Sequence, residues 1–245
     1  MRFLRAAWKL LRALLQALQG LATIVLRFPA LDPLQRQERV QSWARGMLDV
    51  LDIGLVVRGT PPGHGPMLLA ANHISWLDIL VIHAAQYCRF VSKADVKRWP
   101  LIGTLATGAG TLYIERESRR DAVRVVHHMA ASLKAGDVVA IFPEGTTSDG
   151  LSLLPFHGNL VQAAISAGAP VQPLALQFTE AATGENSLAP CYIGDDTLLE
   201  SVWRTLTGPR IVAVVSFGEP QSPAGRDRRA WAQELRGAVD ALRQS

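Results

Sequence analysis

A histidine and an aspartate stand five positions apart, directly after a short apolar run. His73 and Asp78 follow Met67–Ala71, a run with the composition of a buried strand. Ligands of α/β folds bind where such a strand ends, and one helical turn can return the carboxylate to the imidazole. An aspartate so placed fixes the ring tautomer and leaves the other nitrogen as a general base. The simpler alternative is a first-turn acid favoured by the helix dipole, beside a buried hydrogen-bonding histidine.

A second group of polar residues also follows an apolar run. The segment Phe142–Ser148 consists of Phe-Pro-Glu-Gly-Thr-Thr-Ser. Its glycine and three hydroxyl residues supply backbone donors and hydroxyls that suit an anionic or polyol ligand. The alternative is an ordinary loop with a turn-forming Pro-x-Gly.

Two more segments contribute to the pattern. Gly110–Arg116 ends in a basic residue, and Arg119, Arg120 and Arg124 follow it. Arginine presents a bidentate fork to phosphate, although arginines that open a helix are often only solvated. In Ala169–Leu174 two prolines flank the start of an apolar strand, which is most simply a structural feature.

These four segments, in this order, resemble the motifs of the glycerolipid acyltransferases, enzymes that acylate lysophosphatidate and related lysolipids. The family carries N-H-x4-D, G-x-x-F-I-x-R, F-P-E-G-T-R-S and a V-P-V-type strand, and the match here runs from Asn72 to about Leu176. The resemblance implies that His73 and Asp78 form the catalytic pair. It also implies that Arg116, Glu144 and Gly145 bind the acceptor, and we add Thr146, Thr147 and Lys93 as candidates for the same site.

No protein nucleophile is expected. The chain has no G-x-S-x-G sequence, and neither Cys88 nor Cys191 neighbours a histidine. In an acyltransferase the acceptor hydroxyl attacks instead, and His73 removes its proton as the oxygen reaches the thioester carbonyl. The donor is expected to be acyl-CoA or acyl carrier protein, used as a cosubstrate, with no bound cofactor and no metal. Two alternatives are a hydrolase that activates water with the same pair, and a non-catalytic membrane-binding protein.

The acceptor depends on one departure from the family pattern. Thr147 stands where members that handle phosphate usually have arginine. If other cations compensate, the acceptor is 1-acyl-sn-glycerol-3-phosphate and the product is phosphatidate. If they do not, a less anionic acceptor such as lyso-ornithine lipid is favoured, and the lyso-ornithine branch resembles this chain at Ser148-Asp149-Gly150.

Residues 1–30 differ in character from the rest of the chain. On a helical wheel Arg2, Arg5, Lys9 and Arg12 fall within an arc of about 100°, and apolar and aromatic residues occupy the remainder. A basic amphipathic helix of this kind lies in a membrane interface. Its charge-free stretch is shorter than the ~20 residues that a span requires. A span, a signal peptide and a helix packed on the core are the alternatives.

The distribution of charge bears on the partner and the compartment. Five of the 25 basic residues lie within residues 1–31, which contain no acid, so the remainder has 20 basic against 21 acidic residues. A nucleic-acid partner is therefore not expected, because such proteins carry positive charge on the folded domain. Since positive charge stays inside, we expect the protein on the cytoplasmic face of the inner (plasma) membrane, peripheral or monotopic, with membrane lipids as partners.

Residues 31–245 are expected to form one acyltransferase domain of the α/β class, with a largely buried mixed sheet flanked by helices. The expected strands are Leu55–Arg58, Met67–Ala71, Arg89–Ser92, Gly110–Ile114, Val138–Phe142, Val171–Phe178 and Ile211–Phe217. A helix with apolar Val40, Trp43, Met47 and Leu51 is expected after Pro33. Further helices are expected near residues 75–86, 95–107, 119–135 and 158–167, with a last helix after Pro223.

Overall fold

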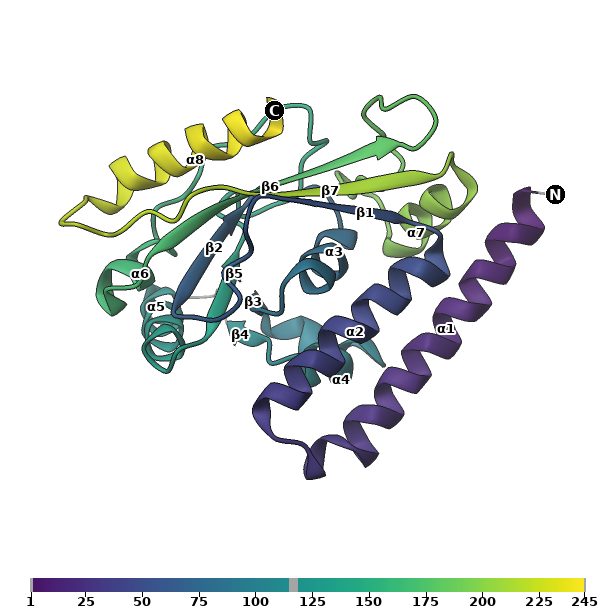
Figure 1. Cartoon of the computed structure of the whole chain (residues 1–245), viewed down its shortest axis with the longest axis horizontal. Helices are drawn as coiled ribbons and strands as arrows, with labels where there is room; N and C mark the ends of the chain where they lie inside the picture. Colours follow the sequence, from purple (N-terminus) through teal and green to yellow (C-terminus); the bar gives the residue numbers. More distant parts are fainter. Residues whose placement is uncertain (1, 115–118, 245) are drawn as a thin grey trace.

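The computed structural model describes residues 2–114 and 119–244, which form an α/β fold around one mixed sheet (Figure 1). The strands of the described residues are β1 (Gly54–Arg58), β2 (Met67–Ala71), β3 (Arg89–Lys93), β4 (Leu112–Ile114), β5 (Val138–Ile141), β6 (Val171–Glu180) and β7 (Ile211–Phe217). All seven expected strands are present. The fold class predicted from the sequence is confirmed.

The strand order β1-β7-β6-β2-β5-β3-β4 brings the polar motifs to one edge of the sheet. β7 pairs in parallel with β1 and antiparallel with β6, and the strands from β6 to β4 all run in parallel. Ala70 of β2 lies beside Ile141 of β5, so the chain leaves both strands at the same edge. Asn72–Asp78 and Phe142–Ser148 therefore become neighbours, as the carboxyl ends of parallel strands must.

Helices cover both faces of the sheet. The helices of the described residues are α1 (Arg2–Leu26), α2 (Pro33–Leu51), α3 (Leu77–Ala85), α4 (Ile102–Gly108), α5 (Arg119–Lys134), α6 (Gln162–Ala167), α7 (Leu198–Thr207) and α8 (Arg228–Gln244), with the short 3-10 helices η1 (Phe28–Ala30) and η2 (Ala94–Arg98). In β2, Leu69 and Ala71 point into the core with α2 and α3, whereas Leu68 and Ala70 pack with α5, α6 and α8. This alternation explains why the strand is apolar throughout.

The helices depart from the sequence expectation in two places. The single helix expected near 95–107 is divided into η2 and α4, because Pro100 lacks a backbone N–H and Leu101 has a positive φ of 64°. Helix α7 was not expected. Its start is marked by a capping box in which Thr197 and Glu200 bond each other's backbone, a signal present in the sequence.

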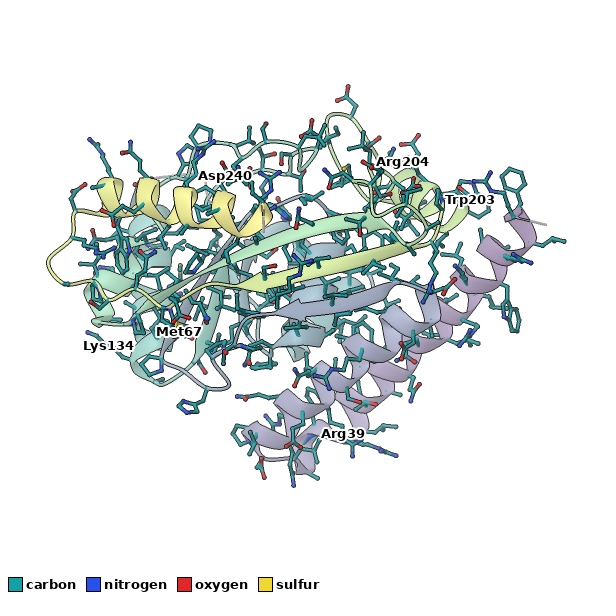
Figure 2. The ribbon with its side chains drawn as sticks, turned by 45° about the horizontal axis from the view of Figure 1, so that its top comes forward. Arg39, Met67, Lys134, Trp203, Arg204 and Asp240 are labelled. Atoms are coloured by element: carbon teal, nitrogen blue, oxygen red, sulfur yellow. The ribbon has the colours of Figure 1, made fainter. Side chains whose placement is uncertain are left out.

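Helix α1 packs on the body through a narrow strip of small residues. Ala6, Ala17 and Gly20 are buried, and each stands two positions after an exposed leucine, about 200° further around the helix. The apolar arc with Leu4, Leu15 and Leu18 therefore faces away from the protein. Figure 1 shows α1 as the outer helix beside α2, and Figure 2 places Trp203 of α7 near its start.

Candidate active site

The imidazole of His73 and the carboxylate of Asp78 are in direct contact. His73 Nδ1 lies 2.7 Å from Asp78 Oδ2, and this contact leaves Nε2 as the ring nitrogen available to a substrate. The side chain of His73 is 22% exposed, whereas that of Asp78 is 0% exposed. The pair therefore has the arrangement of a general base and the acid that orients it.

Asp78 is held by the start of α3. Its Oδ2 also accepts hydrogen bonds from the backbone N–H groups of Ile74, at 2.7 Å, and Ser75, at 3.0 Å. These donors come from the turn between β2 and α3, and Asp78 lies in the first turn of α3. Both sequence readings of Asp78, as a first-turn acid and as the partner of His73, thus apply to the same carboxylate.

The end of β5 supplies the surface against which His73 rests. The imidazole stacks on the Phe142 ring with centroids 3.9 Å apart. The backbone of Ser148 donates to the carbonyl of His73 at 2.9 Å. Side chain and main chain are both fixed, so the ring has a defined orientation towards the cavity that it lines.

The loop after β5 turns its glycine and threonines towards that cavity. Gly145 has a φ of 74°, a conformation that favours glycine, and Gly145, Thr146 and Thr147 all line the cavity. The Thr147 hydroxyl donates to the carbonyl of Tyr192. Within the described part of the chain the N–H groups of Thr146 and Thr147 have no hydrogen-bond acceptor, and successive backbone N–H groups of this kind are suited to an anionic oxygen.

Of the other three predicted acceptor residues, the structure describes two. Lys93 ends β3 and lines the cavity. Glu144 is 4% exposed, and backbone N–H groups of the protein occupy both its oxygens. Arg116 lies outside the described residues, so its predicted role is untested.

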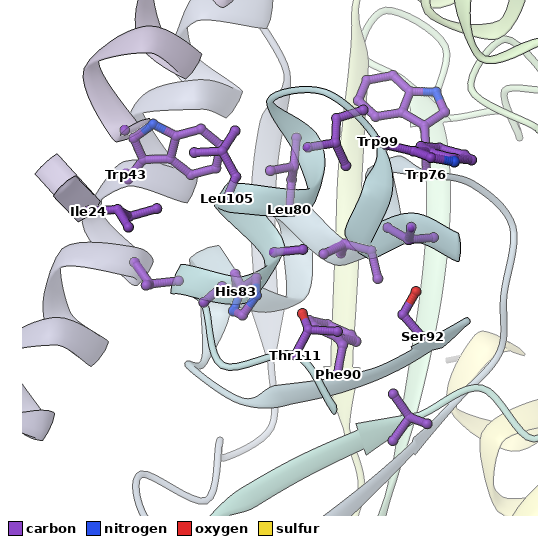
Figure 3. A pocket seen from close by; sticks show the side chains of 18 of the residues that line it. Ile24, Trp43, Trp76, Leu80, His83, Phe90, Ser92, Trp99, Leu105 and Thr111 are labelled. Atoms are coloured by element: carbon purple, nitrogen blue, oxygen red, sulfur yellow. The ribbon is translucent and has the colours of Figure 1, made fainter. Parts of the chain in front are cut away.

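A cavity of about 840 Å³ extends from this site across the face of α3 (Figure 3). Most of the side chains labelled there are apolar or aromatic, among them Trp76, Leu80, Phe90 and Leu105. Ile24 and Trp43 close the side formed by α1 and α2. The space is large enough for a drug-sized ligand and suits a hydrocarbon chain.

Sequence reasoning missed the residues that reach the cavity from distant segments. The backbone of Tyr192 donates to the carbonyl of Ile74 at 3.1 Å, which brings the 190–196 loop over the site. Gly20 of α1 and Trp43 of α2 also line the cavity. Neither the loop nor the helix pair carries a local motif, and only the tertiary structure reveals their role.

Burial changes the protonation behaviour of other ionisable groups around the site. Burial raises the pKa of Cys191 to about 11, and it also raises the pKa of the Cys88 thiol, so neither is a thiolate nucleophile near neutral pH. Burial lowers the pKa of His83, on the cavity wall, to about 4 and keeps it neutral. Among residues 2–114 and 119–244, no group of three His, Cys, Asp or Glu side chains is placed to hold a metal.

Comparison with known proteins supplies independent information. Residues 38–177 match the family described as Acyltransferase. A 1-acyl-sn-glycerol-3-phosphate acyltransferase of Neisseria meningitidis serogroup B is 40% identical over 86% of this chain and 82% of its own length. A lyso-ornithine lipid O-acyltransferase of Pseudomonas aeruginosa is 40% identical over 87% of this chain and 81% of its own length. The crystal structure of the 1-acyl-sn-glycerophosphate acyltransferase PlsC of Thermotoga maritima has the same fold, with a TM-score of 0.70. The match covers 100% of this chain and 99% of that chain, and the two sequences are 19% identical.

Proposed function

Because this chain belongs to the acyltransferase family, we propose that it transfers a fatty acyl group from an acyl thioester to the free hydroxyl of a lysolipid. It is an O-acyltransferase of lipid biosynthesis. The observation that carries the mechanism is the 2.7 Å contact between His73 and the buried Asp78, made at the wall of an apolar cavity.

The transfer needs no covalent enzyme intermediate. His73 Nε2 takes the proton of the acceptor hydroxyl, the oxygen attacks the thioester carbonyl, and Asp78 stabilises the imidazolium that forms. The C–S bond then breaks, and the imidazolium returns the proton to the leaving thiolate. The donor is acyl-CoA or an acyl group carried on acyl carrier protein. The hydrocarbon chain of this acyl group occupies the apolar cavity. No cofactor or metal takes part.

The proposed acceptor is 1-acyl-sn-glycerol-3-phosphate. Lys93, Arg116 and the free N–H groups of Thr146 and Thr147 would hold its phosphate. One observation favours the alternative acceptor, a lyso-ornithine lipid. The Thr147 hydroxyl already donates a hydrogen bond to the carbonyl of Tyr192, and it carries no charge, whereas an arginine at this position would be positive. Both activities occur among relatives of equal identity.

Product analysis tests this function directly. The full chain in mixed micelles is given lysophosphatidate, lyso-ornithine lipid or lysophosphatidylcholine with each thioester donor, and the lipids are identified by mass spectrometry. A diacylated product that requires both substrates is the expected result. Release of free fatty acid at the same rate without any acceptor would instead identify a hydrolase.

Thr147→Arg separates the two acceptors. A guanidinium at this wall position supplies a charge-assisted bond, roughly twice as strong as a neutral one, so KM for lysophosphatidate should fall about tenfold. KM for lyso-ornithine lipid should stay the same. Thr147→Gln is the matched control, because it also removes the bond to Tyr192 but adds no charge. Unchanged KM values for both acceptors in Thr147→Arg would show that position 147 does not face the head group.

The N-terminal helix favours association of the protein with a membrane. The most apolar window of α1 has a mean hydropathy of 1.3, and only 11% of it is buried, unlike the core helix of a soluble protein. By length and composition α1 could also cross a membrane. We propose that it lies in the interface on the cytoplasmic face of the inner membrane, because Arg5 and Arg12 flank its exposed apolar arc.

Charge reversal at Arg5 and Arg12 should weaken binding to anionic vesicles at least tenfold, since each basic residue near such a surface contributes about 1 kcal/mol. Sedimentation with vesicles of graded anionic content measures the effect, and added salt should reduce the difference. Lys9→Gln is the control, because Lys9 already pairs with Asp52 at 3.0 Å and Asp52 keeps its second partner, Arg210, at 3.0 Å. Equal binding by the Arg5 and Arg12 variant would show that another surface holds the membrane.

A further inference from the structure

The carboxylate of Glu144 is saturated by the protein itself. Its Oε1 accepts the backbone N–H of His73 at 2.8 Å, and its Oε2 accepts the backbone N–H of Leu154 at 2.9 Å. The side chain is buried, and Glu144 is not among the residues that line the cavity, whereas the next residue, Gly145, is. The carboxylate therefore faces the interior of the protein and not the space that an acceptor would fill.

These contacts make Glu144 part of a clamp on the peptide of His73. Glu144 accepts its N–H, and Ser148 from the same loop donates to its carbonyl at 2.9 Å. Asp78 separately holds the imidazole. Glu144 and Ser148 thus hold the main chain of His73 directly, whereas Asp78 orients its ring.

The other end of the Glu144 carboxylate anchors the clamp to the body of the fold. Leu154, which donates to Oε2, accepts from Arg236 Nε of α8 at 3.1 Å through its carbonyl. These two bonds connect the Glu144 carboxylate, which holds His73, to a helix on the far face of the sheet. A buried carboxylate with two backbone donors is also costly to replace, because loss of an acceptor leaves an N–H unsatisfied.

We propose that Glu144 is a positioning residue that fixes the main chain of the general base, and that it does not bind the acceptor. The family resemblance assigned Glu144 to the acceptor site, and the geometry gives it a different task. The proposal depends on His73 being the base of the proposed function. Burial raises the pKa of Glu144, and the N–H groups of His73 and Leu154 oppose this by stabilising its charged form.

Glu144→Gln tests the two roles against each other. The amide has only one oxygen, so either the His73 N–H or the Leu154 N–H loses its acceptor, and the side chain no longer links the His73 peptide to the body of the fold. A displacement of about 1 Å can cost 10²-fold in rate, and we expect kcat to fall about 10- to 100-fold. KM for the acceptor should change less than twofold, and the loss in kcat should be equal for lysophosphatidate and lyso-ornithine lipid.

Two further measurements keep the outcome decisive. Glu144→Asp retains the charge but is too short to reach both donors, so its kcat should also fall, and it serves if the glutamine variant does not fold. Amide hydrogen exchange of the full chain without substrate should be faster at His73 in both variants. An acceptor KM raised tenfold or more with kcat unchanged, or an effect on one head group only, would overturn the proposal. Failure of the proposed function would appear separately, as absence of transfer by the unaltered protein.

Discussion

Replacing His73 with alanine is expected to lower the rate of acyl transfer by about 10²–10⁴-fold while leaving the fold intact, because the general base is lost. The imidazole is the only basic group that both lines the cavity and contacts a buried carboxylate among the described residues. The hydroxyl of the acceptor would then have to attack the thioester without a proton acceptor. Initial rates with purified protein in mixed micelles measure the loss.

The fold of this variant should be retained for a structural reason. The bonds to Glu144 and Ser148 use the main chain of His73, so alanine keeps them. Thermal unfolding of the variant provides the check. His128→Ala is a matched control, because His128 is exposed on α5 and does not line the cavity. Transfer by His73→Ala at more than a tenth of the normal rate would exclude this mechanism.

The strands can be predicted from the sequence because each is marked by a local pattern of residues. Strands such as β2 and β5 are short apolar runs bounded by turn residues, and covering by helices on both faces keeps them free of polar side chains. The strand order has no such local signal. The antiparallel pairing of β6 and β7 depends on packing across the whole sheet, and so does the position of α7.

The site shows the same division between local and tertiary information. The contact between His73 and Asp78 follows from their spacing at the start of one helix. The saturation of Glu144 by Leu154 and the bond from Thr147 to Tyr192 do not, because each joins segments whose approach is set by the fold. Motif chemistry alone therefore identifies the loop, but it does not show which of its side chains are already bonded within the protein.

Asp78→Asn should also lower acyl transfer strongly, by about 10²-fold or more, although the amide has nearly the same shape as the carboxylate. The two backbone donors, Ile74 and Ser75, require an oxygen at the place of Oδ2, so the amide oxygen should occupy it and preserve the turn. That oxygen still accepts from His73 Nδ1 but is neutral. It cannot stabilise the imidazolium that forms as the acceptor loses its proton.

The double variant His73→Ala with Asp78→Asn decides whether the two residues act as one unit. If Asp78 works only through the imidazole, its replacement has nothing further to remove once His73 is gone. The double variant should then be as active as His73→Ala alone, since losses within a catalytic unit are strongly non-additive. Rates of all four proteins, at saturating donor and acceptor, provide the comparison. Losses that multiply would mean that Asp78 contributes to the reaction by a route other than the orientation and charge of His73.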